Sequence, residues 1–443
     1  MGDLNVHAEG AAIPVGRAIS SRSYAYYVVA VLTLAYAVNV MDRSVLAVLN
    51  ESIKHEFGIS DKLLGVLGGL SFALFYSTLG LPIAALADRT SRRSVLAACC
   101  ALWSGATAMC GIASNFWLLV LARVGTAVGE AGGTPPSHAL ISDYFPLRER
   151  GLVLSLYALG VPLGAMLGSG LGGWSNDLVG WRMTFILVGL PGLLVATLVR
   201  FTVREPRRGH SDVISAAVAK GQTPSLASAL RYLWGRPSFR HMGIAAGLHS
   251  LVWYSGSQLN ASFLQRSHNM TSGQAGFWLA IFSATSAIGT LLGGYLSDKL
   301  STRSGDRRWY MWVPGIATLA MVPFQFSSYL AGSLWVVVPS FIIMLIFGSM
   351  FFGPSFALSQ GLATLRTRAV ATSLTLFIQT LIGLGLGPFL AGAISDYLHP
   401  TLGRDSLRYG LAAVGVINAW AAVHYFRGAR TVRADMDLAV TMP

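Results

Sequence analysis

Charged residues are scarce in this chain. Asp, Glu, Lys and Arg together make up 12% of its 443 residues, whereas a soluble domain carries roughly 25%. A soluble fold of this length could not cover its surface with so few charges, and the mean hydropathy of +0.57 supports the same exclusion. The composition also excludes an intrinsically disordered chain, which combines high charge with few apolar residues.

Cysteine and reactive motifs are also rare. Cys99, Cys100 and Cys110 lie in one apolar run, so we interpret them as small apolar fillers and expect no disulfide framework. The chain has no Gly-x-x-x-x-Gly-Lys-Ser/Thr and no His-Glu-x-x-His sequence. We therefore expect neither ATP-driven pumping nor an enzyme, and no cofactor or metal.

Long apolar runs are abundant instead. A helix needs about 20 mostly apolar residues to cross a bilayer. Residues 1–20 are polar or small, and we expect no cleavable signal peptide. Twelve spans are predicted: residues 24–48, 63–86, 94–114, 116–140, 151–174, 182–203, 241–263, 274–297, 309–328, 333–358, 370–394 and 407–427.

The longest polar stretch, from Arg204 to Arg240, separates these spans into two sets of six. Within it, Thr223-Pro224-Ser225 is typical of a helix start, and Leu226, Leu230 and Leu233 follow at helical spacing. We predict a short interfacial helix there. The expected parts are an N-terminal segment (1–23), a six-helix bundle (24–203), a linker (204–240), a second six-helix bundle (241–427) and a tail (428–443).

The basic residues indicate an orientation. The net charge of +13 does not indicate a nucleic-acid partner, because the basic residues form short clusters between apolar stretches. With the N-terminus placed in the cytoplasm, 24 of the 32 Lys and Arg residues fall on the inside, six fall on the outside, and Arg43 and Arg123 fall within spans. This bias predicts a multi-pass protein of the cell membrane with both termini in the cytoplasm.

A short pattern recurs at three-span intervals. A small residue followed four positions later by Asp ends the second, fifth, eighth and eleventh spans, at Asp88, Asp177, Asp298 and Asp396. This recurrence is expected of inverted three-helix repeats that are duplicated between two halves. The alternative is that small residues and Asp are simply common at helix ends.

The first copy continues as Asp88-Arg89-Thr90-Ser91-Arg92-Arg93. It resembles the loop signature of the major facilitator superfamily, Gly-x-x-x-Asp-Arg-x-Gly-Arg-Arg, with Ala84 and Ser91 in place of two glycines. The resemblance implies an all-α fold of twelve helices in two bundles of inverted repeats. An Asp at a helix end can bond a neighbouring helix N-terminus and pair with Arg, so we predict a cytoplasmic gate. Plain positive-inside anchoring is the alternative. The predicted gate residues are Asp88, Arg89, Arg92, Arg93 and Asp298.

Four charged residues stand inside predicted spans, where each costs roughly 2.5–3.5 kcal/mol. Asp42 and Arg43 belong to the first span, and Arg123 and Glu130 belong to the fourth. The two residues of the fourth span lie about 10.5 Å apart along the helix axis and do not pair easily with each other. We therefore predict that Asp42 lies near Arg123 and that Arg43 reaches Glu130.

Polar residues also extend along the fourth span. Thr126, Thr134 and Ser137 continue the spacing of Arg123 and Glu130 and form one polar stripe on an apolar helix. A partly dehydrated acid beside a movable Arg can change protonation as access alternates, so Asp42 and Glu130 are predicted proton carriers with Arg43 and Arg123 as charge partners. A static cluster that fixes helix packing is the alternative.

Three segments resemble the spinster family: Asn39-Val40-Met41-Asp42-Arg43, Arg123 to Ala131, and Ile141-Ser142-Asp143-Tyr144-Phe145-Pro146. Members of that family are carriers of lysophospholipids and sphingoid lipids, some of them proton-linked. The resemblance implies a lipid substrate and supports the functional role of the four membrane charges. It covers the first five spans and reaches only the superfamily level beyond them.

The second half has no charged residue in mid-span, and its aromatic residues suit an acyl chain. Core packing is the alternative for each aromatic, and a satisfied buried histidine is the alternative for His249. The predicted substrate cavity contains Asn39, Thr126, Thr134, His249, Trp253, Phe352 and Gln379.

Other functions remain open at this point. An organic-anion/proton symporter or a drug-type antiporter would fit the same charges, since cavity arginines can bind a carboxylate or a phosphate. A channel is a further alternative, because it requires no alternating gates. We expect a monomer whose partners are an amphipathic lipid or another amphiphile, protons and membrane lipids.

Overall fold

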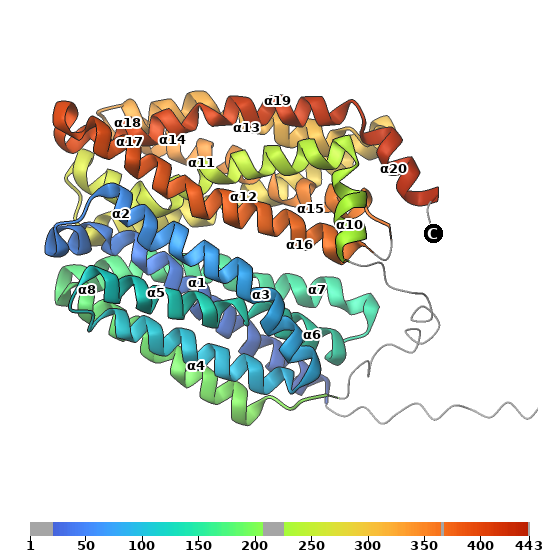
Figure 1. Ribbon diagram of the computed structural model, residues 1–443, viewed down its shortest axis with the longest axis horizontal. Helices are drawn as coiled ribbons and strands as arrows, with labels where there is room; N and C mark the ends of the chain where they lie inside the picture. Colours follow the sequence, from blue (N-terminus) through green and yellow to red (C-terminus); the bar gives the residue numbers. More distant parts are fainter. Residues whose placement is uncertain (1–20, 207–225, 365–366, 442–443) are drawn as a thin grey trace, which may run out of the picture.

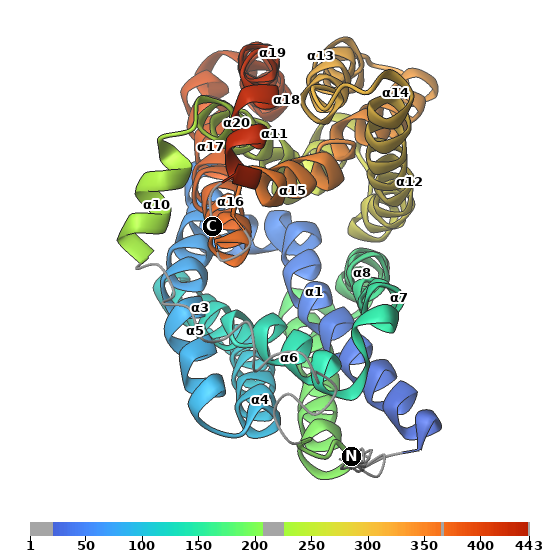
Figure 2. The same cartoon turned by 90° about the vertical axis from the view of Figure 1, so that its right-hand side faces the viewer.

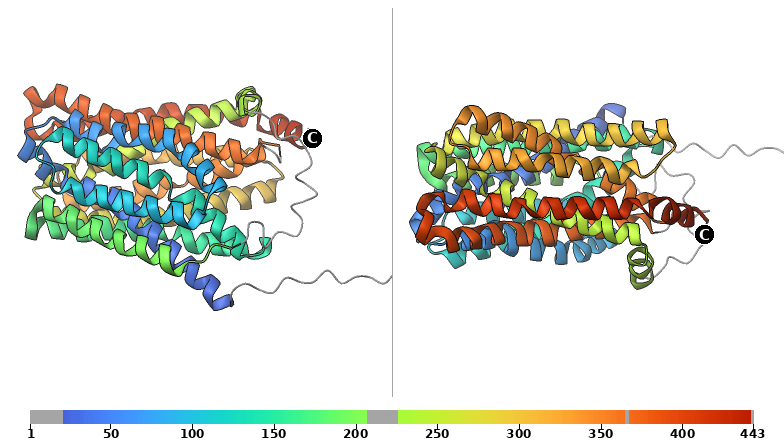
Figure 3. Two further views of the ribbon diagram at one scale, coloured as in Figure 1. Left: turned by 60° about the horizontal axis from the view of Figure 1, so that its bottom comes forward. Right: turned by 90° about the horizontal axis from the view of Figure 1, so that it is seen from above.

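The computed structural model describes residues 21–206, 226–364 and 367–441, and every regular element in these ranges is a helix. The helices run roughly along the long axis of the molecule and form two bundles (Figure 1; Figure 3). We name the end at which α1 and α11 begin the basic end, and the end that carries Glu51, Asp61 and Arg266 the far end. The predicted helix start at 223–225 lies outside the described residues.

The first bundle, the N-half, packs its helices around α1 and α8. Ser21 caps the start of α1, and Gly58 ends it in the left-handed conformation. Gly180, with φ of 76°, turns the chain inside α8 so that this element crosses twice, as predicted. The elements are α1 (Arg22–Phe57), α2 (Asp61–Gly65), the π-helix η1 (Val66–Leu70), α3 (Ser71–Arg89), α4 (Arg92–Cys110), α5 (Phe116–Ala131), α6 (Thr134–Tyr144), α7 (Leu147–Ala158) and α8 (Gly160–Thr202).

The second bundle, the C-half, follows the short helix α10, which confirms the predicted helix in the linker. The α11 and α19 helices pack along each other, and α13 packs against both α14 and α19. The elements are α10 (Leu226–Trp234), α11 (Pro237–His268), α12 (Ser272–Ser304), α13 (Trp309–Leu330), α14 (Leu334–Ser349), α15 (Phe352–Gly361), α16 (Arg368–Ile378), the π-helix η2 (Gln379–Leu386), α17 (Gly387–Leu402), η3 (Gly403–Asp405), α18 (Ser406–Gly415), α19 (Ile417–Ala429) and α20 (Val432–Thr441).

The twelve predicted crossings correspond to these helices or to pairs of them. Among the described residues, seven helical stretches are long and apolar enough to cross a membrane, and the two of 54 and 60 residues have room for two crossings each. The prediction of one unbroken helix over 116–140 is wrong, because α5 ends at Ala131 and α6 begins at Thr134. Pro135 and Pro136 lack the N–H groups that would continue the ladder of α5.

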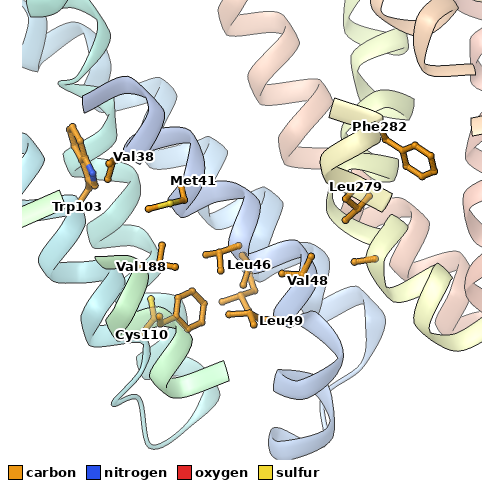
Figure 4. Packing of buried hydrophobic residues seen from close by; sticks show 14 of the residues in the cluster. Val38, Met41, Leu46, Val48, Leu49, Trp103, Cys110, Val188, Leu279 and Phe282 are labelled. Atoms are coloured by element: carbon orange, nitrogen blue, oxygen red, sulfur yellow. The ribbon is translucent and has the colours of Figure 1, made fainter. Parts of the chain in front are cut away.

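The apolar core of the N-half lies mainly between α1, α4 and α8. Cys100 and Cys110 are fully buried in it, and Cys99 is half-buried, which confirms their role as apolar fillers. The outward faces remain apolar as well: Trp335 is 91% exposed and Leu291 is 75% exposed, as expected where lipid replaces water. Figure 4 shows part of this packing, with Val38, Met41, Leu46, Val48, Leu49, Trp103, Cys110 and Val188, and with Leu279 and Phe282 on α12.

Candidate functional site

Four charged side chains meet inside the N-half, and all come from two helices. Asp42 and Arg43 stand in the middle of α1, and Arg123 and Glu130 stand on α5. Asp42 is 0% exposed, and Arg123 and Glu130 are each 1% exposed. The residues are therefore brought together as predicted, in a region where an unpaired charge is costly.

The predicted pairing of Arg43 with Glu130 is confirmed. The Nε of Arg43 donates to the Oε2 of Glu130, and this carboxylate is enclosed while the Arg43 side chain remains 30% exposed. The Arg43 guanidinium also lies 4.9 Å from the ring centre of Phe72 and 4.7 Å from that of Tyr76. Two aromatic rings of α3 thus hold the cation by cation–π attraction.

The prediction that Asp42 lies near Arg123 is confirmed, and the hydrogen bond between the two residues goes to the backbone of Asp42. Arg123 Nη1 donates to the backbone carbonyl of Asp42 at 3.4 Å. The carboxylate instead accepts a hydrogen bond from Thr107 Oγ1 on α4, at 3.1 Å. The sequence reasoning missed Thr107, although Ser104 and Thr107 form a polar i, i+3 pair in an apolar helix.

Several buried polar atoms of this cluster have no hydrogen-bond partner among the described residues: Asn39 Nδ2, Asp42 Oδ1, Arg123 Nε and Glu130 Oε1. An unsatisfied buried polar atom costs about 1–3 kcal/mol. Each carboxylate therefore presents one oxygen that can take a proton or a water. The arrangement is suited to proton exchange as well as to packing.

An aromatic cluster connects these charges to the C-half. Phe72 and Tyr76 pack with Tyr254 on α11 and Leu384 in η2. Thus the rings that contact Arg43 also contact the second bundle. Sequence reasoning missed this pair of rings, for which the i, i+4 spacing of Phe72 and Tyr76 in a predicted span was an available signal.

The predicted cavity residues differ in burial and in hydrogen bonding. Thr126 is fully buried and donates to the Ala122 carbonyl, and Thr134 is half-buried at the start of α6. Ser137, the last member of the predicted stripe, donates to the Gly133 carbonyl. The break between α5 and α6 therefore interrupts that stripe.

The cavity candidates of the C-half differ from one another. His249 is fully buried and both its ring nitrogens are engaged, Nε2 by the Gly348 carbonyl at 2.7 Å and Nδ1 by Thr318 at 3.1 Å. It has no free ring nitrogen to offer a ligand. Trp253 and Phe352 are half-buried and meet edge to face. Gln379 begins η2, and its buried Nε2 has no partner among the described residues.

The predicted gate residues bond within their own halves. The Arg92 guanidinium pairs with Asp143, and the backbone N–H groups of Arg92 and Arg93 donate to the Glu205 carboxylate at 2.7 and 2.9 Å. Asp298 accepts a 2.6 Å hydrogen bond from Tyr310. Arg89 is exposed at the end of α3, and the Asp88 side chain lies outside the described part.

Asp177 and Asp396, the two other copies of the repeated Asp, cap helices of the opposite half at the far end. Asp177 accepts from the backbone N–H of Gly273 at 2.9 Å, and Asp396 accepts from those of Asp61 and Lys62 at 2.8 and 2.9 Å. The helices approach closely there, because a Cβ on Gly173 would lie 2.2 Å from the Ser272 carbonyl oxygen.

A buried ion cluster, which the sequence reasoning missed, lies beside these caps. Arg266 of α11 bonds both Glu51 and Asp61 of the N-half at 2.6–2.9 Å, and Lys54 pairs with Asp61 at 2.5 Å. Hydrogen bonds between the halves thus gather at the far end in the described part of the chain. Figure 2 looks at the molecule from the basic end, with the C-half above and the N-half below.

Comparison with known proteins identifies this architecture. The sequence model of the Major Facilitator Superfamily matches residues 32–378 and 242–435. A bacterial homolog of the human lysosomal transporter spinster, solved in an inward-facing and unoccupied conformation, superposes with a TM-score of 0.85 and 32% identity, over 94% of this chain and 99% of that one.

Curated relatives agree on transport and differ in cargo. An MFS-type efflux pump of Mycolicibacterium smegmatis is 31% identical, over 93% of this chain and 94% of its own length. A sphingosine-1-phosphate transporter of Danio rerio is 26% identical, over 85% of this chain and 77% of its own. A D-galactonate transporter of Escherichia coli is 24% identical, over 92% and 96%.

The chain therefore belongs to the major facilitator superfamily, and within it to the spinster-type transporters. It is a multi-pass membrane transporter of a small molecule, and its relatives are transporters rather than enzymes.

Proposed function

We propose that the protein is a secondary active transporter that moves an amphipathic lipid, of the lysophospholipid or sphingoid type, by proton-coupled alternating access. The observation that carries the coupling is the enclosed Arg43–Glu130 pair, in which one carboxylate oxygen has no partner among the described residues. No ATP-binding motif supplies energy, so an ion gradient or the substrate gradient drives the movement.

The geometry of that pair supports the following proton step. Arg43 is partly exposed and lies between rings that also touch the C-half, whereas Glu130 is enclosed. When the halves tilt, the rings move relative to Glu130 and draw Arg43 away from it. A carboxylate that loses its counter-ion in a nonpolar surrounding binds a proton. Asp42, bonded to Thr107 rather than to Arg123, is the second proton carrier.

The difference in charge and in contacts between the two ends supports a direction of access. We propose that the basic end is cytoplasmic, because Lys and Arg gather there, and that the structure is the state closed at the far end. Asp177 and Asp396 would then hold the outer side closed. By the inverted repeat, Asp88 and Asp298 with Arg89, Arg92 and Arg93 would close the cytoplasmic side after the halves tilt.

The proposal of a lipid substrate rests on similarity to a lipid transporter and on aromatic side chains in both halves. The half-buried Tyr76, Trp253 and Phe352 provide aromatic surface for an acyl chain, and Arg123 keeps an unpartnered Nε that can meet an anionic headgroup. A relative that transports sphingosine-1-phosphate supports this cargo. We propose that one chain, acting as a monomer in the cell membrane, contains the whole path.

Uptake of a labelled lysophospholipid into proteoliposomes tests the proposal. We expect saturable uptake that an imposed pH gradient of one sign accelerates and that a collapsed gradient slows. Saturable counterflow distinguishes a carrier from a channel. Gradient-insensitive, non-saturable lipid movement would contradict the proposal.

A second candidate is an organic-anion/proton symporter. The unpartnered Arg123 Nε suits a carboxylate as well as a phosphate, and one relative transports D-galactonate. Drug-type antiport is the third possibility, which the efflux-pump relative supports. Competition separates them: unlabelled lysolipid should block uptake, whereas sugar acids and cationic drugs should not.

A further inference from the structure

A cluster of four basic residues lies on the C-half at the basic end, apart from the four central charges. We name it the His–Arg patch: Arg240 and His241 in the first turns of α11, and His424 and Arg427 in the last turns of α19. The two helices run antiparallel and pack along each other (Figure 1). A Cβ on Gly428 would lie 2.9 Å from the His241 Cβ, so the contact here is tight.

The two imidazoles face each other. His241 Nδ1 and His424 Nδ1 are 2.9 Å apart, so one ring donates and the other accepts. A neutral ring that accepts through Nδ1 must carry its proton on Nε2. At least one Nε2–H of the pair is therefore free to donate to an outside acceptor.

Among the residues that the structure describes, no acid neutralises the patch. The charged groups that act on the imidazoles, besides each other, are Arg240 and Arg427. Both arginines are exposed, and in the described part of the chain neither has an ion-pair or hydrogen-bond partner. Asp435 on the following helix, α20, is bonded instead to the backbone N–H and the hydroxyl of Ser238.

An apolar stripe leads away from the patch toward the middle of the helices. Val416, at the N-cap of α19, is 56% exposed, and Trp420 and Val423 on that helix are 58% and 44% exposed. All three lie along the same face as Arg427. Trp420 packs on His424 with ring centres 6.0 Å apart. Seven residues of helix place Trp420 roughly 10 Å deeper than Arg427. The surface thus combines a cationic head region with an apolar track.

We propose that the His–Arg patch is a binding site for an anionic phospholipid of the leaflet at the basic end. The phosphate accepts hydrogen bonds from Arg240, Arg427 and an imidazole Nε2–H, and the acyl chains lie along Val416, Trp420 and Val423. A basic site at the helix ends with an apolar approach is the chemistry that recognises acidic lipid headgroups. This site is independent of the proposed transport cargo and of the central charges.

Lipid retention by the purified full-length protein tests this, measured by native mass spectrometry with phosphatidylglycerol and phosphatidylcholine of equal chain length. We expect phosphatidylglycerol to be retained preferentially. The R240Q/R427Q variant should lose this preference, because each guanidinium removed weakens binding about fivefold. The matched control is R303Q/R307Q, which removes two exposed arginines of the same end and should retain the preference.

The wild type supplies a second arm that does not depend on a variant folding. Inorganic phosphate in excess should not displace phosphatidylglycerol from the wild type, because it cannot occupy the apolar stripe. A separate variant, W420A, should weaken retention while leaving the headgroup preference. Equal retention of the two lipids by the wild type, or an unchanged preference in R240Q/R427Q, would overturn the proposal. Displacement by inorganic phosphate would show a phosphate site rather than a lipid site.

Discussion

The two halves share a helical plan but differ in how they use buried polar groups. The N-half encloses two acids and two arginines, and some of their atoms lack partners among the described residues. In the C-half, the buried His249 has both ring nitrogens engaged, and Tyr329 donates to Asn260 at 2.9 Å. These two neutral pairs fix packing, although the buried Nε2 of Gln379 in the C-half also has no partner among the described residues. The difference that remains is one of charge, because the groups without partners in the N-half are ionisable.

This difference indicates where the chemistry of transport lies. A neutral hydrogen-bonded pair contributes about 1 kcal/mol and has no reason to change between states. The electrostatic energy of an enclosed ion pair changes steeply when one of its two charges moves away from the other. Under the proposed mechanism, both halves therefore take part in the motion, and the proton chemistry is confined to the N-half.

The largest effect is expected from removing the partner of Glu130. R43Q leaves a carboxylate enclosed without its counter-ion, and we expect a loss of stability of about 3–5 kcal/mol, seen as a lowered apparent Tm in detergent. The double variant R43Q/E130Q should recover most of the loss. R22Q, which breaks an exposed pair with Glu149, is the control and should lower the apparent Tm far less, because solvent screens this pair. Additive losses in the double variant would contradict the pairing.

The matching change in the C-half should be smaller and of another kind. T318V removes the hydroxyl bonded to His249 Nδ1 and should cost about 1–3 kcal/mol through an unsatisfied nitrogen. The pH dependence of uptake should stay that of the wild type. A pH profile shifted as strongly as that of a Glu130 variant would break the contrast between the halves.

Asp177 and Asp396, which cap helices at the far end, can be changed in a matched pair of variants, and we expect a smaller effect from each. D177N and D396N each remove a negative charge from the N-terminus of a helix of the opposite half, a contact typically worth 0.3–1 kcal/mol. We expect the population of the state that is open at the far end to rise by up to about fivefold in either variant. Alkylation of Q258C, buried between the halves, in a chain without its native cysteines, measures this. Unchanged alkylation in both variants would show that the caps do not hold the halves together.

The smallest effect concerns Asp306, in the loop between α12 and α13. Hydrogen bonds from Arg308 and then Arg433 hold the pKa of this carboxyl well below its usual range. A lowered folded-state pKa contributes stability above the unfolded-state value of about 3.9, and this contribution disappears as the pH falls through the folded-state value. D306N should therefore lower the apparent Tm at pH 7, and the difference from wild type should shrink below about pH 4. A difference that grew on acidification would contradict this assignment.

The positions of the membrane-spanning segments were predictable from sequence, because each apolar run is long enough to cross a bilayer. Such a run can be recognised from its own residues, without knowledge of the tertiary structure. Asp42, Arg43, Arg123 and Glu130 were predictable for the same reason, since charges in such runs are rare. The Arg43–Glu130 contact followed from helix direction and depth. The role of Thr107 did not, because a hydroxyl is common in membrane helices and nothing local ties it to Asp42.

The cluster at the far end was also beyond sequence reasoning. Arg266, Glu51 and Asp61 stand at helix ends, where charges are ordinary, and only the approach of the two halves buries them together. The repeat pointed to Asp177 and Asp396 without showing that each caps a helix of the opposite half. The end of α5 at Ala131 was missed because the periodic polar pattern continued through Pro135 and Pro136.

The central claim is that the acids of the N-half connect proton movement to tilting of the halves. E130Q and D42N in proteoliposomes test it, with gradient-driven accumulation and gradient-free counterflow of lysophospholipid measured on the same preparations. The account predicts that counterflow persists while accumulation under a pH gradient is lost in at least one variant. Accumulation equal to that of the wild type in both variants would contradict it.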